Sequence, residues 1–146
     1  MATGRLAALE GAPRVFGDTS FFFATADPTD ANHQRSREIS EVVKTLGIRV
    51  YTTWEIVVES VTLLRYRANF PTSHRFLTET LPILALLHSS EAERKAAIAF
   101  YLQRSASQRL SLCDALSYVI VSSRLNWAPC LTFDRHFAAL GLTVVR

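Results

Sequence analysis

Apolar residues recur along the chain with two periods, one typical of strands and one typical of helices. Residues 48–53 alternate and are rich in β-branched side chains, which predicts a strand. Ile39, Val43 and Leu46 lie on one stripe of a helix that Gly47 ends as a left-handed cap. On the same criteria we expect strands over 14–18, 48–53, 130–133 and 142–145, and helices over 19–26, 30–46, 54–66, 72–81, 91–104, 112–125 and 135–139.

Short apolar strands that alternate with helices predict an α/β fold, with helices on both faces of a short, mainly parallel central sheet. A chain of 146 residues fits one domain. We assign residues 14–146 to this domain and 1–13 to an N-terminal extension that is floppy or loosely docked. In sheets of this kind the working site lies beyond the carboxyl ends of the strands.

The composition narrows the class of protein. With 49% hydrophobic and 20% charged residues, the chain is neither disordered nor collagen-like. The uncharged run 80–90 is about half the roughly 20 residues that a spanning helix needs, and residues 1–13 lack the apolar core of a signal peptide. Cys113 and Cys130 stand alone, which favours small buried side chains in a reducing, cytoplasmic setting over zinc ligands.

The net charge of +3 and the pI near 9.2 are compatible with a nucleic-acid partner. Arginine, which binds phosphate in bidentate fashion, dominates, because Lys44 and Lys95 are the only lysines. An ordinary solvated surface would explain the positive net charge and the excess of arginine equally well.

Four carboxylates occupy positions where their neighbours indicate burial. Asp18 closes the predicted strand 14–18 and Asp134 directly follows the predicted strand 130–133, whereas Glu59 and Asp114 lie near the beginnings of predicted helices. Asp18 and Asp134 also suit helix N-caps, and Asp114 stands three residues after Ser111, the spacing of a capping box. Each acid therefore has a structural explanation of its own.

Taken together, the four acids predict a metal site at one edge of the sheet. Carboxylates that meet in one cleft repel one another and raise each other's proton affinity. A divalent cation offsets this cost, and Mg²⁺ or Mn²⁺ takes hard oxygen ligands and binds substrate phosphates. A basic protein with such a cleft suits metal-assisted phosphodiester chemistry.

Four segments, in order, resemble the motifs of PIN domains. They are DTSFFFA with the downstream D-x-x-D-A-N-H, the helix sequence of residues 55–62, SLCDALSYVIV, and CLTFDRHF. The resemblance covers residues 14–145 and implies a PIN-like three-layer α/β/α sandwich. Gly17 departs from the pattern, since a larger apolar residue is common before the first acid.

The resemblance implies a metal-dependent endoribonuclease with Asp18, Glu59, Asp114 and Asp134 as its catalytic, metal-binding residues. Asp18 and Asp114 would be the most direct ligands of Mg²⁺ or Mn²⁺, and the other two would act mostly through water. A metal-activated water would hydrolyse RNA and leave 5′-phosphate and 3′-hydroxyl ends. Supporting polar positions are Thr19, Ser20 and Thr132, and candidate substrate-binding arginines are Arg65, Arg67 and Arg135.

Size and single-domain build are most similar to VapC-type toxins of type II toxin–antitoxin pairs. This resemblance implies a small antitoxin that masks the acidic cleft with a basic side chain, and a homodimer with contacts from residues 21–23 or the middle helices. We expect no membrane association, because the uncharged run 80–90 is too short to span a bilayer.

Alternatives remain at this stage. A housekeeping RNA-processing nuclease of the same fold fits equally, and a non-catalytic interaction module would use the acids only as caps. A metal-free ribonuclease would need a histidine pair as acid and base. Phosphotransfer domains of the haloacid-dehalogenase type need D-x-D, whereas this chain has Asp18-Thr19-Ser20, and receiver domains need a lysine beyond Lys95.

Overall fold

The computed structural model of the protein describes residues 6–146, and it contains one five-stranded sheet in which every neighbouring pair of strands is parallel. The strand order is β3-β2-β1-β4-β5, so β1 lies at the centre. The strands are β1 (Arg14–Gly17), β2 (Arg49–Thr53), β3 (Ala85–Leu87), β4 (Cys130–Leu131) and β5 (Val144–Val145).

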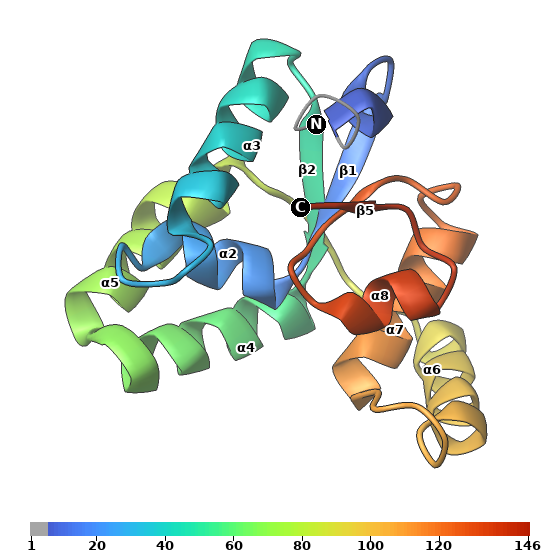
Figure 1. Ribbon diagram of the computed structural model, residues 1–146. Coiled ribbons are helices and arrows are strands. Elements are labelled where there is room, and N and C mark those ends of the chain that lie inside the picture. The colour runs from blue at the N-terminus through green and yellow to red at the C-terminus, as the bar shows by residue number, and fades with distance from the viewer. Residues whose placement is uncertain (1–5) are drawn as a thin grey trace.

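Helices cover both faces of this sheet, which confirms the predicted α/β/α sandwich. Figure 1 shows α2 to α5 on one side of β1 and β2, and α6 to α8 on the other. The α-helices are α2 (Thr19–Ala26), α3 (His33–Thr45), α4 (Trp54–Leu63), α5 (Phe70–Arg75), α6 (Glu91–Arg104), α7 (Leu112–Ser123) and α8 (Arg135–Ala139). Shorter turns are the 3₁₀ segments η1 (Ala7–Leu9) and η4 (Leu81–Ile83) and the π-helical segments η2 (Leu64–Ala68) and η3 (Phe76–Thr80).

The core consists of apolar side chains from the sheet and from the helices on each face. Phe16 on β1 is fully buried, as are Ile56 on α4 and Phe137 on α8, each at 1% exposure or less. Leu9 is also fully buried in this core. Within the predicted extension, the side chain of Leu9 is thus part of the core, and residues 1–5 lie outside the described part.

The middle of the chain differs most from the prediction. The sequence predicts one helix over 72–81, whereas α5 begins earlier, with Asn69 accepting a hydrogen bond from the Thr72 amide at 2.8 Å. The segment continues as η3 and η4 before it ends. Strand β3 is absent from the predicted elements because its Ala-Leu-Leu sequence lacks the β-branched residues that signal a strand.

The other differences are at element ends. Helix α3 begins at His33 rather than at residue 30, because the Asp27 and Asp30 carboxylates accept hydrogen bonds from backbone amides two residues later and hold a turn. Among residues 6–146, no helix is long and apolar enough to cross a bilayer.

Candidate active site at the carboxyl edge of the sheet

Asp18 lies directly after the central strand β1 and is the N-cap of α2. Its side chain is only 4% exposed. The carboxylate oxygen Oδ2 accepts hydrogen bonds from the Ser20 hydroxyl at 2.9 Å and the Thr132 hydroxyl at 2.8 Å. The chain thus places one buried acid at the middle of the sheet edge, held by hydroxyl groups from two segments that are far apart in sequence.

Burial raises the pKa of Asp18 from 3.8 to about 6, the hydrogen bonds from Thr132 and Ser20 lower it in part, and the charge of Asp114 raises it. An acid is normally buried with a cationic partner, because a desolvated carboxylate is costly. Among residues 6–146, the ion pairs are Arg35–Glu38, Lys95–Glu91 and Arg124–Glu93, and none involves the four predicted site acids.

Ser20 and Thr132 join the beginning of α2 to the loop that follows β4. Their hydroxyl oxygens are 3.1 Å apart. Ser20 also accepts a hydrogen bond from the Phe133 amide at 2.9 Å, and Thr132 accepts one from the Asp134 amide at 3.0 Å. This network fixes the position of the loop relative to Asp18.

Asp134 is the N-cap of α8, as the sequence predicts. Its Oδ1 accepts a hydrogen bond from the His136 amide at 2.9 Å. The β1–β4 pairing brings this loop beside Asp18, because Gly17 pairs with Leu131.

Asp114 forms the predicted capping box at the start of α7. The Ser111 amide donates to Asp114 Oδ2 at 3.0 Å, and the Asp114 amide donates to the Ser111 hydroxyl at 3.0 Å. Burial raises the pKa of Asp114, the hydrogen bonds from Ser111 oppose this, and the charges of Asp134 and Glu59 raise it further. The fold therefore brings Asp114 within electrostatic reach of the other three acids.

Glu59 lies in the second turn of α4 and is half-buried. Cys113 is its neighbour from α7. Burial raises the pKa of the Cys113 thiol, and the charge of Glu59 and a hydrogen bond to it raise the pKa further. Cys113 is free and partly buried, and Cys130 is free and fully buried.

The four carboxylates of the site suit a divalent cation in chemistry and in charge. Four carboxylates supply hard oxygen ligands, and the buried Asp18 carboxylate, which has no ion-pair partner among residues 6–146, is a charge that a cation would offset. As the side chains stand, however, no three His, Cys, Asp or Glu residues of the described part form a metal-binding group. Asp114 and Asp134 instead accept hydrogen bonds at their helix caps.

The remaining predicted positions divide into two groups. Ser20 and Thr132 hold Asp18, whereas the Thr19 hydroxyl is buried and finds no hydrogen-bond partner in the described part of the chain. Arg135 is exposed beside Asp134 at the start of α8. Arg65 and Arg67 are exposed and lie in η2, which directly follows α4, the helix that carries Glu59.

Two contributors are missing from the sequence prediction. Thr52 is fully buried on β2 and donates a hydrogen bond to the Gly17 carbonyl at 2.9 Å, which supports the backbone before Asp18. Cys113 contacts Glu59. A threonine in a β-branched strand and a lone cysteine carry no local signal of a site, and only strand pairing and helix packing bring them there.

The fold matches solved structures, although neither the protein-family models nor the curated proteins give a match. Mycobacterium tuberculosis VapC20, a sarcin-ricin loop cleaving toxin, matches with a TM-score of 0.77 at 23% identity, over 88% of this chain and 96% of that chain. FitAcB from Neisseria gonorrhoeae matches with a TM-score of 0.62 at 15% identity, over 90% of this chain and 96% of that chain. The chain therefore has the PIN fold that the sequence motifs imply.

Proposed function

We propose that this protein is a metal-dependent endoribonuclease and the toxin of a VapBC-type pair. The observation that supports it best is the desolvated Asp18 carboxylate at the centre of the sheet edge, which has no cationic partner among residues 6–146 and is within reach of the charge of Asp114. The shared fold with a sarcin-ricin loop cleaving toxin supports the RNA substrate.

In the proposed site, Asp18 and Asp114 are the direct ligands of Mg²⁺ or Mn²⁺, and Glu59 and Asp134 act mostly through water. The bound cation supplies a water of lowered pKa and offsets charge on the phosphoryl oxygens. Ser20 and Thr132 are positioning residues, because their hydroxyls hold Asp18 Oδ2. Asp134 and Glu59 orient the attacking water, and the products carry 5′-phosphate and 3′-hydroxyl ends.

The test is cleavage of labelled structured and single-stranded RNAs by the purified protein with Mg²⁺, Mn²⁺ or EDTA. We expect cleavage that EDTA abolishes and that Asp18→Asn and Asp114→Asn reduce by at least about a hundredfold, since each removes a ligand charge. Asp27→Asn is the matched control, because Asp27 is 8% exposed and holds only the Thr29 turn. Cleavage that survives EDTA would point to histidine chemistry instead.

Metal binding separates this proposal from a non-catalytic interaction module, which the capping roles of Asp18, Asp114 and Asp134 would also fit. We expect Mn²⁺ titration by calorimetry to show binding by the wild type and weaker binding by Asp18→Asn. Absence of both binding and cleavage would favour the interaction module.

Partner binding separates a toxin from a housekeeping nuclease. A toxin should be inhibited by a small protein that inserts a basic side chain into the acidic cleft, whereas a processing enzyme needs none. We also propose a homodimer, supported by exposed apolar side chains on the middle helices, with Tyr66 at 82% and Ile83 at 78% exposure. Two free cysteines fit the proposed cytoplasmic location.

A further inference from the structure

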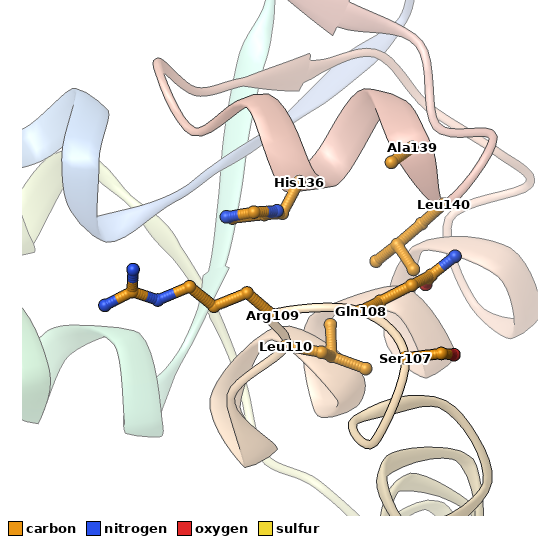
Figure 2. Close-up of a pocket in the computed structure, with 7 residues that line it drawn as sticks. All are labelled: Ser107, Gln108, Arg109, Leu110, His136, Ala139 and Leu140. Carbon is orange, nitrogen blue, oxygen red and sulfur yellow. The ribbon is translucent and has the colours of Figure 1, made fainter.

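Two side chains on the α7–α8 side of the site can donate hydrogen bonds to an anionic group. Arg109 is exposed in the loop between α6 and α7, and His136 is half-buried in the first turn of α8. Both line one cavity of about 230 Å³. Figure 2 shows the Arg109 guanidinium and the His136 ring directed the same way, toward the side on which the ribbons of α2 and α4 lie. The two groups can therefore contact one ligand.

The backbone that carries Arg109 is anchored next to the acids. The following residue, Leu110, is 6% exposed and belongs to the core, and its carbonyl accepts a hydrogen bond from the Ser105 hydroxyl at 2.9 Å. Arg109 also precedes Ser111 by two residues, and the Ser111 amide donates to Asp114 at 3.0 Å. The side chain thus starts from a fixed point of the loop that leads to Asp114.

The backbone of His136 is anchored beside the last of the four acids. Its amide donates to Asp134 at 2.9 Å, and the following residue, Phe137, is fully buried. An imidazole ring carries at least one N–H donor whether it is neutral or charged. His136 can therefore donate a hydrogen bond to a substrate oxygen in either form.

The donors of both side chains are unused in the described part of the chain. The ion pairs among residues 6–146 are Arg35–Glu38, Lys95–Glu91 and Arg124–Glu93, and none includes Arg109. The side-chain hydrogen bonds of these residues likewise involve neither the Arg109 guanidinium nor the His136 ring. A cation and a second donor thus share one cavity beside the acids, without a partner.

The charge of the site explains which ligand these donors suit. Four ionised carboxylates carry twice the charge of one divalent cation, so an RNA phosphate near them is repelled even when that cation is bound. Donors of positive or neutral charge at the rim of the site offset this repulsion. A guanidinium suits a phosphate best, because it donates two parallel N–H groups to two phosphate oxygens.

We propose that Arg109 and His136 bind the RNA phosphate next to the one that is cleaved, an inference that rests on the proposed function. The Arg109 guanidinium donates to both non-bridging oxygens of this phosphate, and the His136 ring donates to one of them. Both are substrate-binding residues and take no part in bond breaking. Because the contact is to the backbone, it positions the RNA without reading its bases.

The experiment removes the charge of one phosphate at a time. Cleavage is first mapped on a single-stranded RNA with Mn²⁺. Short RNAs with this site then carry a single methylphosphonate at each linkage beside the cut, with a 2′-O-methyl ribose before it, since a free 2′-hydroxyl would attack the linkage. The reference RNA has the same ribose and an ordinary phosphate. At one adjacent linkage we expect the neutral group to lower kcat/KM by about tenfold, as befits lost hydrogen bonds to a charged group.

The variants connect this loss to the two side chains. Arg109→Met should lower kcat/KM on the reference RNA by about tenfold and remove most of the methylphosphonate effect, because the charge on each side of the contact is then already gone. Arg109→Lys, which keeps the charge but not the planar fork, should retain part of both. His136→Ala should cause a smaller loss at the same linkage.

Arg37→Met is the matched control, because Arg37 is exposed on α3, across the sheet from α8, and forms no ion pair among residues 6–146 (Figure 1). It should keep the wild-type kcat/KM and the wild-type methylphosphonate effect. Circular dichroism checks that each variant is folded. Mn²⁺ titration by calorimetry checks that the acids are in place, and Arg109→Met should bind Mn²⁺ at least as tightly as the wild type.

The outcomes separate this inference from the proposed function. A folded Arg109→Met that cleaves the reference RNA at the wild-type rate and keeps the methylphosphonate effect would overturn the phosphate contact and leave the nuclease proposal intact. A wild type that cleaves every methylphosphonate RNA like its reference would do the same. A protein that cleaves no RNA would overturn the proposed function and the inference with it.

Discussion

At the scale of single residues, the buried carboxylate of Asp18 links stability to pH. Because the pKa of Asp18 is raised from 3.8 to about 6, the folded chain keeps a proton that the unfolded chain has already released in this range. The stabilisation is complete below pH 4 and is lost as the pH rises through 6. In EDTA, we expect about 3 kcal/mol less unfolding free energy at pH 8 than at pH 4 from this group.

Denaturant titrations of wild type and Asp18→Asn at pH 4–8 report this contribution together with its coupling to Asp114, since groups distant from Asp18 titrate equally in both proteins. The neutral amide should make the variant more stable than the wild type at pH 8, and activity should be lost. Substitutions of functional residues commonly increase stability in this way, because a functional site often lowers the stability of the fold. Parallel pH curves for the two proteins would contradict the raised pKa.

Gly17 illustrates a second effect at this scale, the close approach of a side chain to the backbone. A Cβ atom at this position would meet the ring of Phe22, which is 4% exposed and packs edge-on against Phe76 with ring centroids 5.6 Å apart. This packing explains why the chain departs from the larger residue common before the first acid of PIN domains.

We expect Gly17→Ala to destabilise the fold by about 1–3 kcal/mol through overpacking. The measurement is the midpoint of urea unfolding. The double variant Gly17→Ala/Phe22→Leu should lose less than the sum of the two single variants, because the smaller side chain leaves room for the methyl group. Additive losses would show that Phe22 is not the source of the strain.

At the scale of elements, two capping boxes allow a matched comparison. Ser111 caps α7 with Asp114, and Ser90 caps α6 with Glu93, which pairs with Arg124 instead of the site acids. Both Ser→Ala substitutions should cost about 1 kcal/mol of stability. Only Ser111→Ala should also raise the pKa of Asp114 further, because the hydroxyl bond that opposes the rise is lost.

The expected result is that Ser111→Ala weakens Mn²⁺ binding more at pH 6 than at pH 8, because a higher pKa of Asp114 favours its protonated form at the lower pH. Calorimetric Mn²⁺ titrations at the two pH values provide the measurement. Ser90→Ala should bind Mn²⁺ like the wild type at both. Equal binding by all three proteins at pH 6 would contradict a role of Asp114 as a ligand.

At the scale of the whole molecule, the exposed apolar surface of the middle helices predicts self-association. Tyr66 and Ile83 are 82% and 78% exposed, and burying such side chains between two copies is favourable. We expect a homodimer in light scattering at micromolar concentration, and a monomer for Tyr66→Ser/Ile83→Ser. Leu102→Ser on α6, where Leu102 is 72% exposed, is the control. A dimer that survives the double substitution would place the interface elsewhere.

The whole molecule also explains which sequence predictions were accurate. Helices α2, α6 and α8 begin and end where the pattern predicts, because a local cap at Asp18, Ser90 or Asp134 marks each start. The elements from η2 to β3 were less predictable. Their turns and the edge strand are stabilised by packing, and their residues have no strong preference for strand or helix.

The sequence by itself determined the alternation of strands and helices, and with it the parallel sheet and the helix caps, because periodicity and capping depend on residues close in the chain. It also identified Asp18, Asp114 and Asp134 as acids at element ends. Only the tertiary structure decided that Ser20 and Thr132 share the Asp18 carboxylate, and that Thr52 supports the backbone at Gly17. Parallel strand pairing joins residues more than a hundred positions apart, and no local pattern encodes that contact.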